Sequence, residues 1–162
     1  MSQIVNLAEK MLRERVSGAA AAAAAAGELP SGELPPFAVE VPADRAHGDL
    51  AVNSAMVSAR AFHKPPRRIA EILVSHLDLA DTYFEKAEVA GPGFINLFLN
   101  PSYYAAVVRD VCEKGEEYGR SDYGEGKKVM VEFVSANPTG PMHMGNARGG
   151  VLGDCLSSVL DW

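Results

Sequence analysis

A polar, glycine-rich run at 135–150, SANPTGPMHMGNARGG, holds the residues of this chain best suited to chemistry. His143 and Asn146 carry side-chain donors that can hold phosphate oxygens, and Gly145 has no Cβ to keep a ligand from the backbone. A glycine-rich turn that enters a helix also aims backbone N–H groups and the positive end of the helix dipole at one point. The run is therefore predicted to bind a nucleotide and to stabilise charge on a phosphorus under attack.

The residues just before this run suggest where a second substrate binds. The apolar segment 129–136, VMVEFVSA, is predicted as a strand of a parallel sheet, buried on both faces. Glu132 and Asn137 flank the end of that strand and can grip a cationic or amino-bearing substrate, because a carboxylate at a buried strand end needs a partner. A helix pattern over 147–162 completes the order strand, loop, helix, the first half of a βαβ unit. Such a layout suits adenylyl transfer.

Other chemistries find little support in the sequence. The nucleotide loops GxxxxGK[ST] and GxGxxG are absent, as is the G-x-S-x-G elbow of serine hydrolases. The 4 histidines are scattered without ligand spacing, so no metal site is expected. The 2 cysteines, Cys112 and Cys155, form no CxxC pair and lie on apolar helix faces, so we expect both in the core of a protein from a reducing compartment.

Composition is that of an ordinary globular protein, with 48% hydrophobic and 22% charged residues. The net charge of −6 excludes a chain-wide basic surface, so a polyanionic partner needs a local patch. No run approaches the roughly 18–20 apolar residues that a membrane helix requires, and the first residues lack the apolar core of a signal peptide. We therefore expect a cytoplasmic protein without a membrane partner.

The elements that precede the nucleotide loop predict an α+β domain over residues 1–120. Helical spacing covers 2–26, where the alanine run favours a helix extension over a flexible lever. Asp49 is expected to cap a helix that ends near Phe62, and Pro66 to open the next. The remaining expected elements are a strand at 37–41, two alternating strands around the turn GPG at 91–93, and a helix from Pro101. Residues 121–162 are then the start of a second domain.

Three motifs carry a resemblance to a known family. HMGN at 143–146 resembles the HIGH box of class I aminoacyl-tRNA synthetases, and the string 131–154 around it resembles the arginyl-tRNA synthetases in particular. HGDLAVNSA at 47–55 and AGPGFINLFL at 90–99 resemble the N-terminal tRNA-contacting domain of that family. The order and distances also match, so the chain resembles the front portion of such a synthetase.

For the catalytic site, the resemblance implies that His143, Gly145 and Asn146 contact ATP, with His143 and Asn146 steadying the transition state. Gly145 would leave room for adenine. Asn146 stands where the family usually has a second histidine, and its amide donates a hydrogen bond without carrying a proton's charge. The resemblance therefore implies an ATP role for Asn146, and no acid–base role follows.

For arginine, the resemblance implies that Glu132, Ser135 and Asn137 face the substrate. Glu132 is the natural partner of the guanidinium, because a carboxylate matches its fork geometry. Asn137 would bind the amino-acid end.

For tRNA, the resemblance places Phe94 and Asn96 on the strand that approaches the D-loop, where an aromatic ring and an amide can read an unpaired base. The alternatives are that Phe94 is a core residue and that Asn96 only satisfies a turn. A basic patch without an acid between residues 50 and 70 could meet the phosphate backbone, or could be an ordinary solvated face. Its members are Arg60, His63, Lys64, Arg67 and Arg68.

Taken together, the sequence is identified as a member of the arginyl-tRNA synthetase family, a truncated chain in which an α+β domain precedes the first β-loop-α of a Rossmann-type catalytic domain. The implied reaction of protein biosynthesis uses ATP with Mg²⁺ to activate L-arginine and transfers it to its tRNA. We expect the fragment alone to be inactive, to bind arginine tRNA, and to self-associate through its exposed apolar faces. The alternatives are a stand-alone RNA-binding module and a small adenylyltransferase.

Overall fold

A computed structural model describes residues 3–137 and 139–162, and the contacts within it divide the chain into two units. The first unit ends at Gly115 and the second runs from Glu116 to Trp162, so the division falls near the boundary predicted after residue 120. In this described part, none of the helices combines the length and apolarity needed to cross a membrane.

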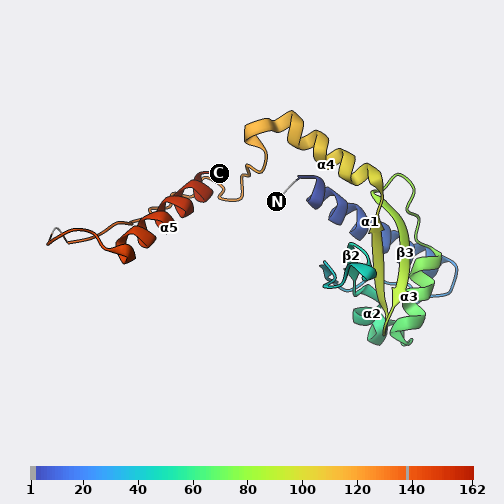
Figure 1. Ribbon diagram of the computed structural model, residues 1–162. Coiled ribbons are helices and arrows are strands. Elements are labelled where there is room, and N and C mark those ends of the chain that lie inside the picture. Colours follow the sequence, from blue (N-terminus) through green and yellow to red (C-terminus); the bar gives the residue numbers. More distant parts are fainter. Residues whose placement is uncertain (1–2, 138) are drawn as a thin grey trace. The chain divides into compact units, whose positions relative to one another are not determined.

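The first unit is built on an antiparallel sheet (Figure 1). Its four strands lie in the order β1-β2-β4-β3. The strands are β1 (Val39–Glu40), β2 (Leu50–Val52), β3 (Phe84–Ala90) and β4 (Phe94–Leu99). The strands predicted at 37–41 and on both sides of the GPG turn are confirmed. β2 was not expected, because its three residues were assigned to the helix that follows them.

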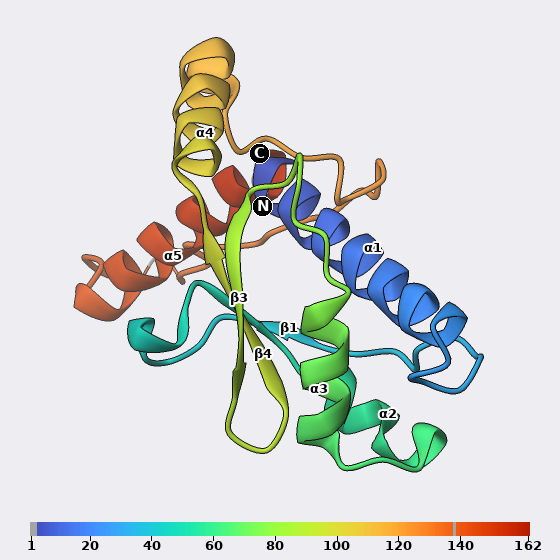
Figure 2. The same cartoon turned by 90° about the vertical axis from the view of Figure 1, so that its right-hand side faces the viewer.

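Helices cover one face of this sheet. α2 (Ser54–Phe62) and α3 (Pro66–Ser75) connect β2 to β3 and pack on the sheet, and α1 (Gln3–Ala25) packs against α3 (Figures 1 and 2). Proline opens α3 as predicted, because its fixed φ suits the first helical turn and no hydrogen bond is lost there. α4 (Pro101–Lys114) follows β4 and begins in the same way. The first unit is therefore an α+β domain.

The core lies between these helices and the sheet. Ile95 and Leu97 of β4 and Val52 of β2 are fully buried there. From α1, the alanine run contributes as well, because Ala19 and Ala23 are 2% and 0% exposed. Small side chains let a helix approach its neighbours closely, so the inner face of the alanine run packs into the core. The run is a continuous part of α1, as predicted for a helix extension.

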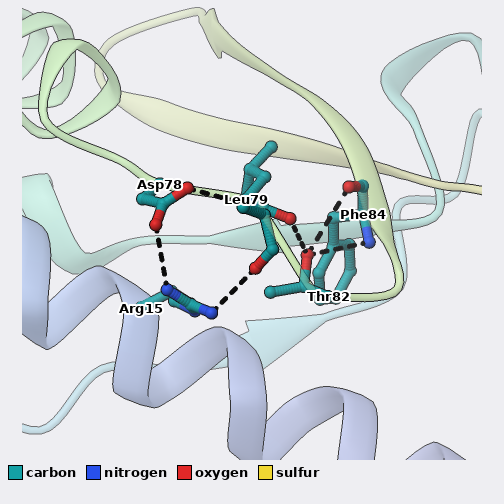
Figure 3. Close-up of polar contacts among 6 residues, drawn as sticks. Arg15, Asp78, Leu79, Thr82 and Phe84 are labelled. Carbon is teal, nitrogen blue, oxygen red and sulfur yellow. Dashed lines mark hydrogen bonds and ion pairs between the residues drawn. The ribbon is translucent and has the colours of Figure 1, made fainter.

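Arg15 of α1 holds the loop between α3 and β3 (Figure 3). Its Nη1 lies 3.2 Å from Oδ2 of Asp78, and its Nη2 donates to the carbonyl of Ala80 at 2.8 Å. In the same loop, the Thr82 hydroxyl accepts a hydrogen bond from the N–H of Phe84 at 3.2 Å. These bonds fix the entry of the chain into β3.

The HGD motif anchors β4 and does not cap a helix, which corrects the prediction for Asp49. Oδ2 of Asp49 accepts a hydrogen bond from the N–H of Leu99 at 2.8 Å, and the Asp49 N–H donates to the carbonyl of Leu97 at 2.9 Å. The N-cap of α2 is Asn53 instead. The cap prediction failed because β2 lies between Asp49 and α2, and its hydrogen bonds to β4 set the chain direction there.

The second unit contains a helix, α5 (Met144–Asp161), and a segment without regular structure that lies over it. Phe133 packs on Gly153, where a Cβ would overlap its ring, and Val134 lies over Gly150. Trp162 is tied to the start of the unit, because its carbonyl accepts from the N–H of Ser121 at 3.1 Å.

The strand predicted over 129–136 is wrong for this chain. Residues 127–137 pair with no described strand, and Val134 has a φ of 55°, which is left-handed and incompatible with an extended strand. A parallel strand takes its hydrogen bonds from neighbouring strands, so an apolar pattern alone cannot form one. The helix after the loop is confirmed, and it begins at Met144, earlier than the expected 147.

Both cysteines are exposed, which corrects the expectation that they belong to the core. α4 contains no buried residue, and of the residues of α5 only Gly153 is buried. The apolar faces on which Cys112 and Cys155 were placed do exist, but they stay largely exposed, with Val108 of α4 at 62% and Leu152 of α5 at 69%.

Substituting Gly48 should destabilise the first unit. A Cβ at this position would lie 2.6 Å from the Leu97 carbonyl oxygen, and the φ of +85° already disfavours any other residue. We expect Gly48→Ala to lower the free energy of unfolding by about 2 kcal/mol, measured by urea unfolding followed by circular dichroism. The control, Gly18→Ala in open space within α1, should raise it by about 0.5–1 kcal/mol. An unchanged Gly48→Ala protein would contradict this packing.

Candidate nucleotide-binding loop and RNA-binding face

His143 and Asn146 close the first turn of α5 with their side chains. Nδ1 of His143 accepts a hydrogen bond from the N–H of Gly145 at 3.1 Å. Oδ1 of Asn146 accepts one from the N–H of His143 at 3.2 Å. The first N–H groups of a helix have no partner within the helix, so this reciprocal cap satisfies two donors locally.

The cap determines which atoms of these two side chains stay free. A neutral imidazole that accepts at Nδ1 carries its proton on Nε2, and an amide that accepts at Oδ1 keeps both protons on Nδ2. His143 and Asn146 therefore use their acceptors for the helix and keep N–H donors available at the helix N-terminus. This arrangement favours an anion, because the free donors and the helix dipole attract negative charge together.

A cleft of about 310 Å³ opens beside this cap. It brings together Ser135, Asn137, His143 and Asn146, all of which were predicted to bind ATP or arginine. The volume is at the lower end of the roughly 300–1,000 Å³ of small-molecule sites. The residues that line the cleft are exposed, apart from the half-buried Asn146, so this loop forms an open wall of a site.

Glu132 lies in a different environment from the one predicted. It is exposed, and its Oε1 accepts a hydrogen bond from the hydroxyl of Ser135 at 2.6 Å. The expectation of a buried carboxylate was wrong because it depended on the strand over 129–136. Because Ser135 lines the cleft, Glu132 is still one hydrogen bond away from it.

Gly145 has a structural role in addition to the one that the resemblance implies. A Cβ here would lie 2.9 Å from Cε1 and 3.0 Å from Nδ1 of His143. A side chain at position 145 would therefore displace the imidazole from its capping position. Gly145 does not line the cleft itself.

The face of the sheet away from the helices carries the two residues predicted to contact the D-loop. Phe94 and Asn96 point to this face, because Ile95 and Leu97 between and after them point into the core. Phe94 is half-buried and lies outside the core. Asn96 is 6% exposed and lies within β4, not in a turn.

Asn96 has one small and one charged neighbour across the sheet. Its neighbours across the sheet are Ala51 of β2 and Glu88 of β3. Ala51 contributes only a methyl group on one side of Asn96, and Glu88 is the charged neighbour on the other side; at 6% exposure Asn96 itself is nearly covered.

Phe98 is a candidate that the sequence reading missed. It follows Asn96 by two residues, so it shares the face of Phe94 and Asn96. The ammonium group of Lys86 lies 5.1 Å from the centre of its ring. The alternation within FINLFL was the signal that could have identified it.

The predicted basic patch covers the end of α2 and the first turn of α3. Arg60, Arg67 and Arg68 are exposed, and Lys64 is half-buried. Glu71 lies just outside the acid-free interval and pairs with Arg67 (Nε to Oε1, 3.6 Å) and Arg68 (Nη1 to Oε2, 3.2 Å). Arg60 and Lys64 make no ion pair with the described residues, so they are the members most available to a phosphate. His63 is exposed beside them.

The patch and the open face meet at one end of the sheet, where the β3–β4 turn rests on the start of α3 (Figure 2). Nη1 of Arg67 donates to the carbonyl of Gly91 at 3.2 Å. Gly93 has a φ of +141°, and a Cβ there would lie 2.8 Å from Pro66. Phe94 follows directly, so the tertiary structure brings basic and aromatic residues together.

The structure contains an α+β unit and, after it, a glycine-rich loop that leads into a capped helix. This order of elements agrees with the resemblance of the sequence motifs to aminoacyl-tRNA synthetases. Residues 9–99 match the model of a family described as the arginyl tRNA synthetase N terminal domain. The chain belongs to this family, and the resemblance seen in the sequence is confirmed.

Relatives extend the similarity beyond the family model. Arginine–tRNA ligases of Acetivibrio thermocellus and Caldanaerobacter subterraneus subsp. tengcongensis are 47% and 49% identical to 99% and 100% of this chain. The chain spans 28% and 29% of the length of those relatives. The crystal structure of an arginyl-tRNA synthetase from Plasmodium falciparum has the same fold over 94% of this chain and 28% of its own, with a TM-score of 0.60 at 21% identity.

Two substitutions of His143 should separate its cap from its imidazole chemistry. His143→Ala removes the acceptor for the Gly145 N–H, which typically costs about 1 kcal/mol, so hydrogen exchange at this N–H should become about fivefold faster. His143→Asn should keep the original rate, since asparagine is a good N-cap. NMR-detected amide exchange measures both. Equal rates in all three proteins would show that the cap does not close in solution.

Proposed function

We propose that this chain is the front part of an arginine–tRNA ligase. Its first unit binds the D-loop of arginine tRNA, and its second unit supplies the ATP-contacting loop of a class I, Rossmann-type catalytic domain. The observation that carries this proposal is the similarity to arginine–tRNA ligases along 99–100% of the chain. The similarity includes residues 121–162, which neither a stand-alone RNA-binding module nor an unrelated adenylyltransferase would explain.

The loop is suited to the first step of that reaction, in which arginine attacks the α-phosphorus of ATP and pyrophosphate leaves. The free donors of His143 and Asn146 can hold phosphate oxygens as negative charge develops in the transition state. Glu132 and Ser135 are already hydrogen-bonded to each other beside the cleft, and the carboxylate can accept a guanidinium. Asn137 lines the same cleft and would hold the amino-acid end.

Magnesium would arrive with ATP in this proposal. No group of three or more potential metal ligands occurs among the residues that the structure describes. Mg²⁺ usually binds through one or two carboxylates together with substrate phosphates and water, so a site built from this chain alone is not required. The expected place of action is the cytoplasm, where translation takes place.

We expect the 162-residue chain to be inactive by itself, because it offers one exposed wall of a site that must exclude water. Its unpartnered apolar surface also supports self-association. Val151, Leu152 and Val159 of α5 are 66%, 69% and 71% exposed. Apolar side chains exposed together in this way mark a surface that packs against another surface.

Binding to the D-loop should depend on Phe94. A base stacked on an aromatic ring contributes about 1–3 kcal/mol, so Phe94→Leu should weaken binding of arginine tRNA about 5- to 150-fold. The measurement is a fluorescence titration of labelled transcript with the 162-residue chain. Phe37→Leu, at another half-buried phenylalanine, is the matched control and should leave the affinity unchanged.

The same titration with a transcript altered only in the D-loop completes the test. Wild-type protein should bind this transcript as weakly as Phe94→Leu binds the normal one, and the two changes together should add little. Binding that ignores both changes would refute the proposed contact.

The basic patch should determine the salt dependence of binding. Each phosphate contact contributes roughly 0.7–0.9 to the slope of log K against log salt, so the double variant Arg60→Gln, Lys64→Gln should lower this slope by about 1.4–1.8. The effect should be the same for both transcripts, because phosphate contacts carry no sequence information. Lys10→Gln on α1 should leave the slope unchanged. An unchanged slope in the double variant would show that the patch is only solvated.

A further inference from the structure

The open face of the sheet carries two aromatic rings, with an amide between them. Phe94, Asn96 and Phe98 alternate along β4 on the face away from the core. At about 3.3 Å per residue, the two phenylalanines lie about 13 Å apart along the strand. The face therefore has an aromatic position on each side of Asn96.

Phe98 is not held in place by the core. Its half-buried ring lies outside the set of residues that form or border the core. The ammonium group of Lys86, which lies across the sheet in register with Phe98, is placed over this ring. Lys86 is in turn ion-paired with Glu88, the residue opposite Asn96. A cation over a ring is an exchangeable cover, because an exposed ammonium group is fully solvated once it leaves.

We propose that Phe98 is a second base-stacking platform for the D-loop, and that Lys86 leaves its ring to contact a phosphate when a base arrives. This inference rests on the proposed function, in which Phe94 and Asn96 read the same loop. In this arrangement an unpaired base replaces the ammonium group on the ring, since stacking of a base on an aromatic side chain is stronger than an exposed cation–π contact. The displaced ammonium group then gains an anionic partner in the RNA backbone.

Glu88 is the residue that opposes this exchange. Its carboxylate holds Lys86 and borders Asn96, so it places negative charge beside the position of an RNA strand. The acid therefore acts as a specificity device, because only a loop that makes both stacking contacts and the amide contact overcomes the repulsion.

Tyr104, near the same end of β4, has a partner of its own. Tyr104 donates to Oδ1 of Asp49 at 3.4 Å, and partial burial together with that carboxylate raises the pKa of its hydroxyl. Its hydroxyl is therefore directed at Asp49 and not at the Phe98 and Lys86 pair. Lys86 contacts both the Phe98 ring and the Glu88 carboxylate, and Phe98 is not among the residues that form or border the core.

Two substitutions test the inference with arginine tRNA. Phe98→Leu should weaken binding about 5-fold or more, while Phe37→Leu, whose ring is likewise covered by a cation, Arg13 at 5.3 Å, should not. Glu88→Gln should strengthen binding about 2- to 5-fold, because it removes a negative charge beside the RNA and releases Lys86. Glu113→Gln on α4 is the control for loss of an exposed acid and should have no effect. A gain of affinity cannot arise from misfolding.

A stacking-sensitive probe gives the second readout. The fluorescent base 2-aminopurine, placed in turn at each unpaired D-loop position, should be quenched by the wild-type chain at two positions. Phe94→Leu should abolish one quench and Phe98→Leu the other.

If Phe94→Leu weakens binding and Phe98→Leu does not, the second platform is refuted while the proposed function stands. If the wild-type chain does not distinguish the altered D-loop, both fail.

Discussion

Strand β4 pairs with β2 on one side and β3 on the other, and these two rows of backbone hydrogen bonds fix the direction of each of its side chains. Ile95 and Leu97 fill the core because of this pairing, and the residues between them must face away from it. Asp49 extends the constraint past the end of β2 by accepting the N–H of Leu99. The HGD motif, in which Asp49 was predicted to cap a helix, therefore maintains the register on which the proposed RNA-binding face depends.

The second unit depends on local bonds instead. The reciprocal cap of His143 and Asn146 spans four consecutive positions and needs no sheet to support it. It also explains why an asparagine can stand where the family usually has a histidine: both side chains accept a backbone N–H and keep another donor free. The neighbouring segment 129–136 has no such local solution, because strand hydrogen bonds must come from another part of a fold.

The basic residues are clustered locally, so a chain with a negative net charge still has a surface suited to binding a polyanion. The net charge is −6, yet Arg60 and Lys64 lie without an ion pair among the described residues at the end of the sheet where Phe94 begins β4. Two glutamates lower the positive charge of this surface at particular positions. Glu71 pairs with two arginines of the patch, and Glu88 borders the buried amide of Asn96. Long-range repulsion from the rest of the chain is screened within about 10 Å at moderate salt, so the local pattern decides.

The sequence by itself determined the family, the helices, the β3–β4 hairpin and the loop around His143, because motif spacing, proline positions and side-chain period are local properties. It could not reveal β2, whose three residues become a strand only by pairing with β4. Nor could it show that Asp49 anchors Leu99, or that Phe98 joins the open face beneath Lys86. Only the tertiary structure decided these, because strand pairing and ion pairs join residues far apart in the chain, and the neighbours of a side chain decide whether it is buried, paired or free.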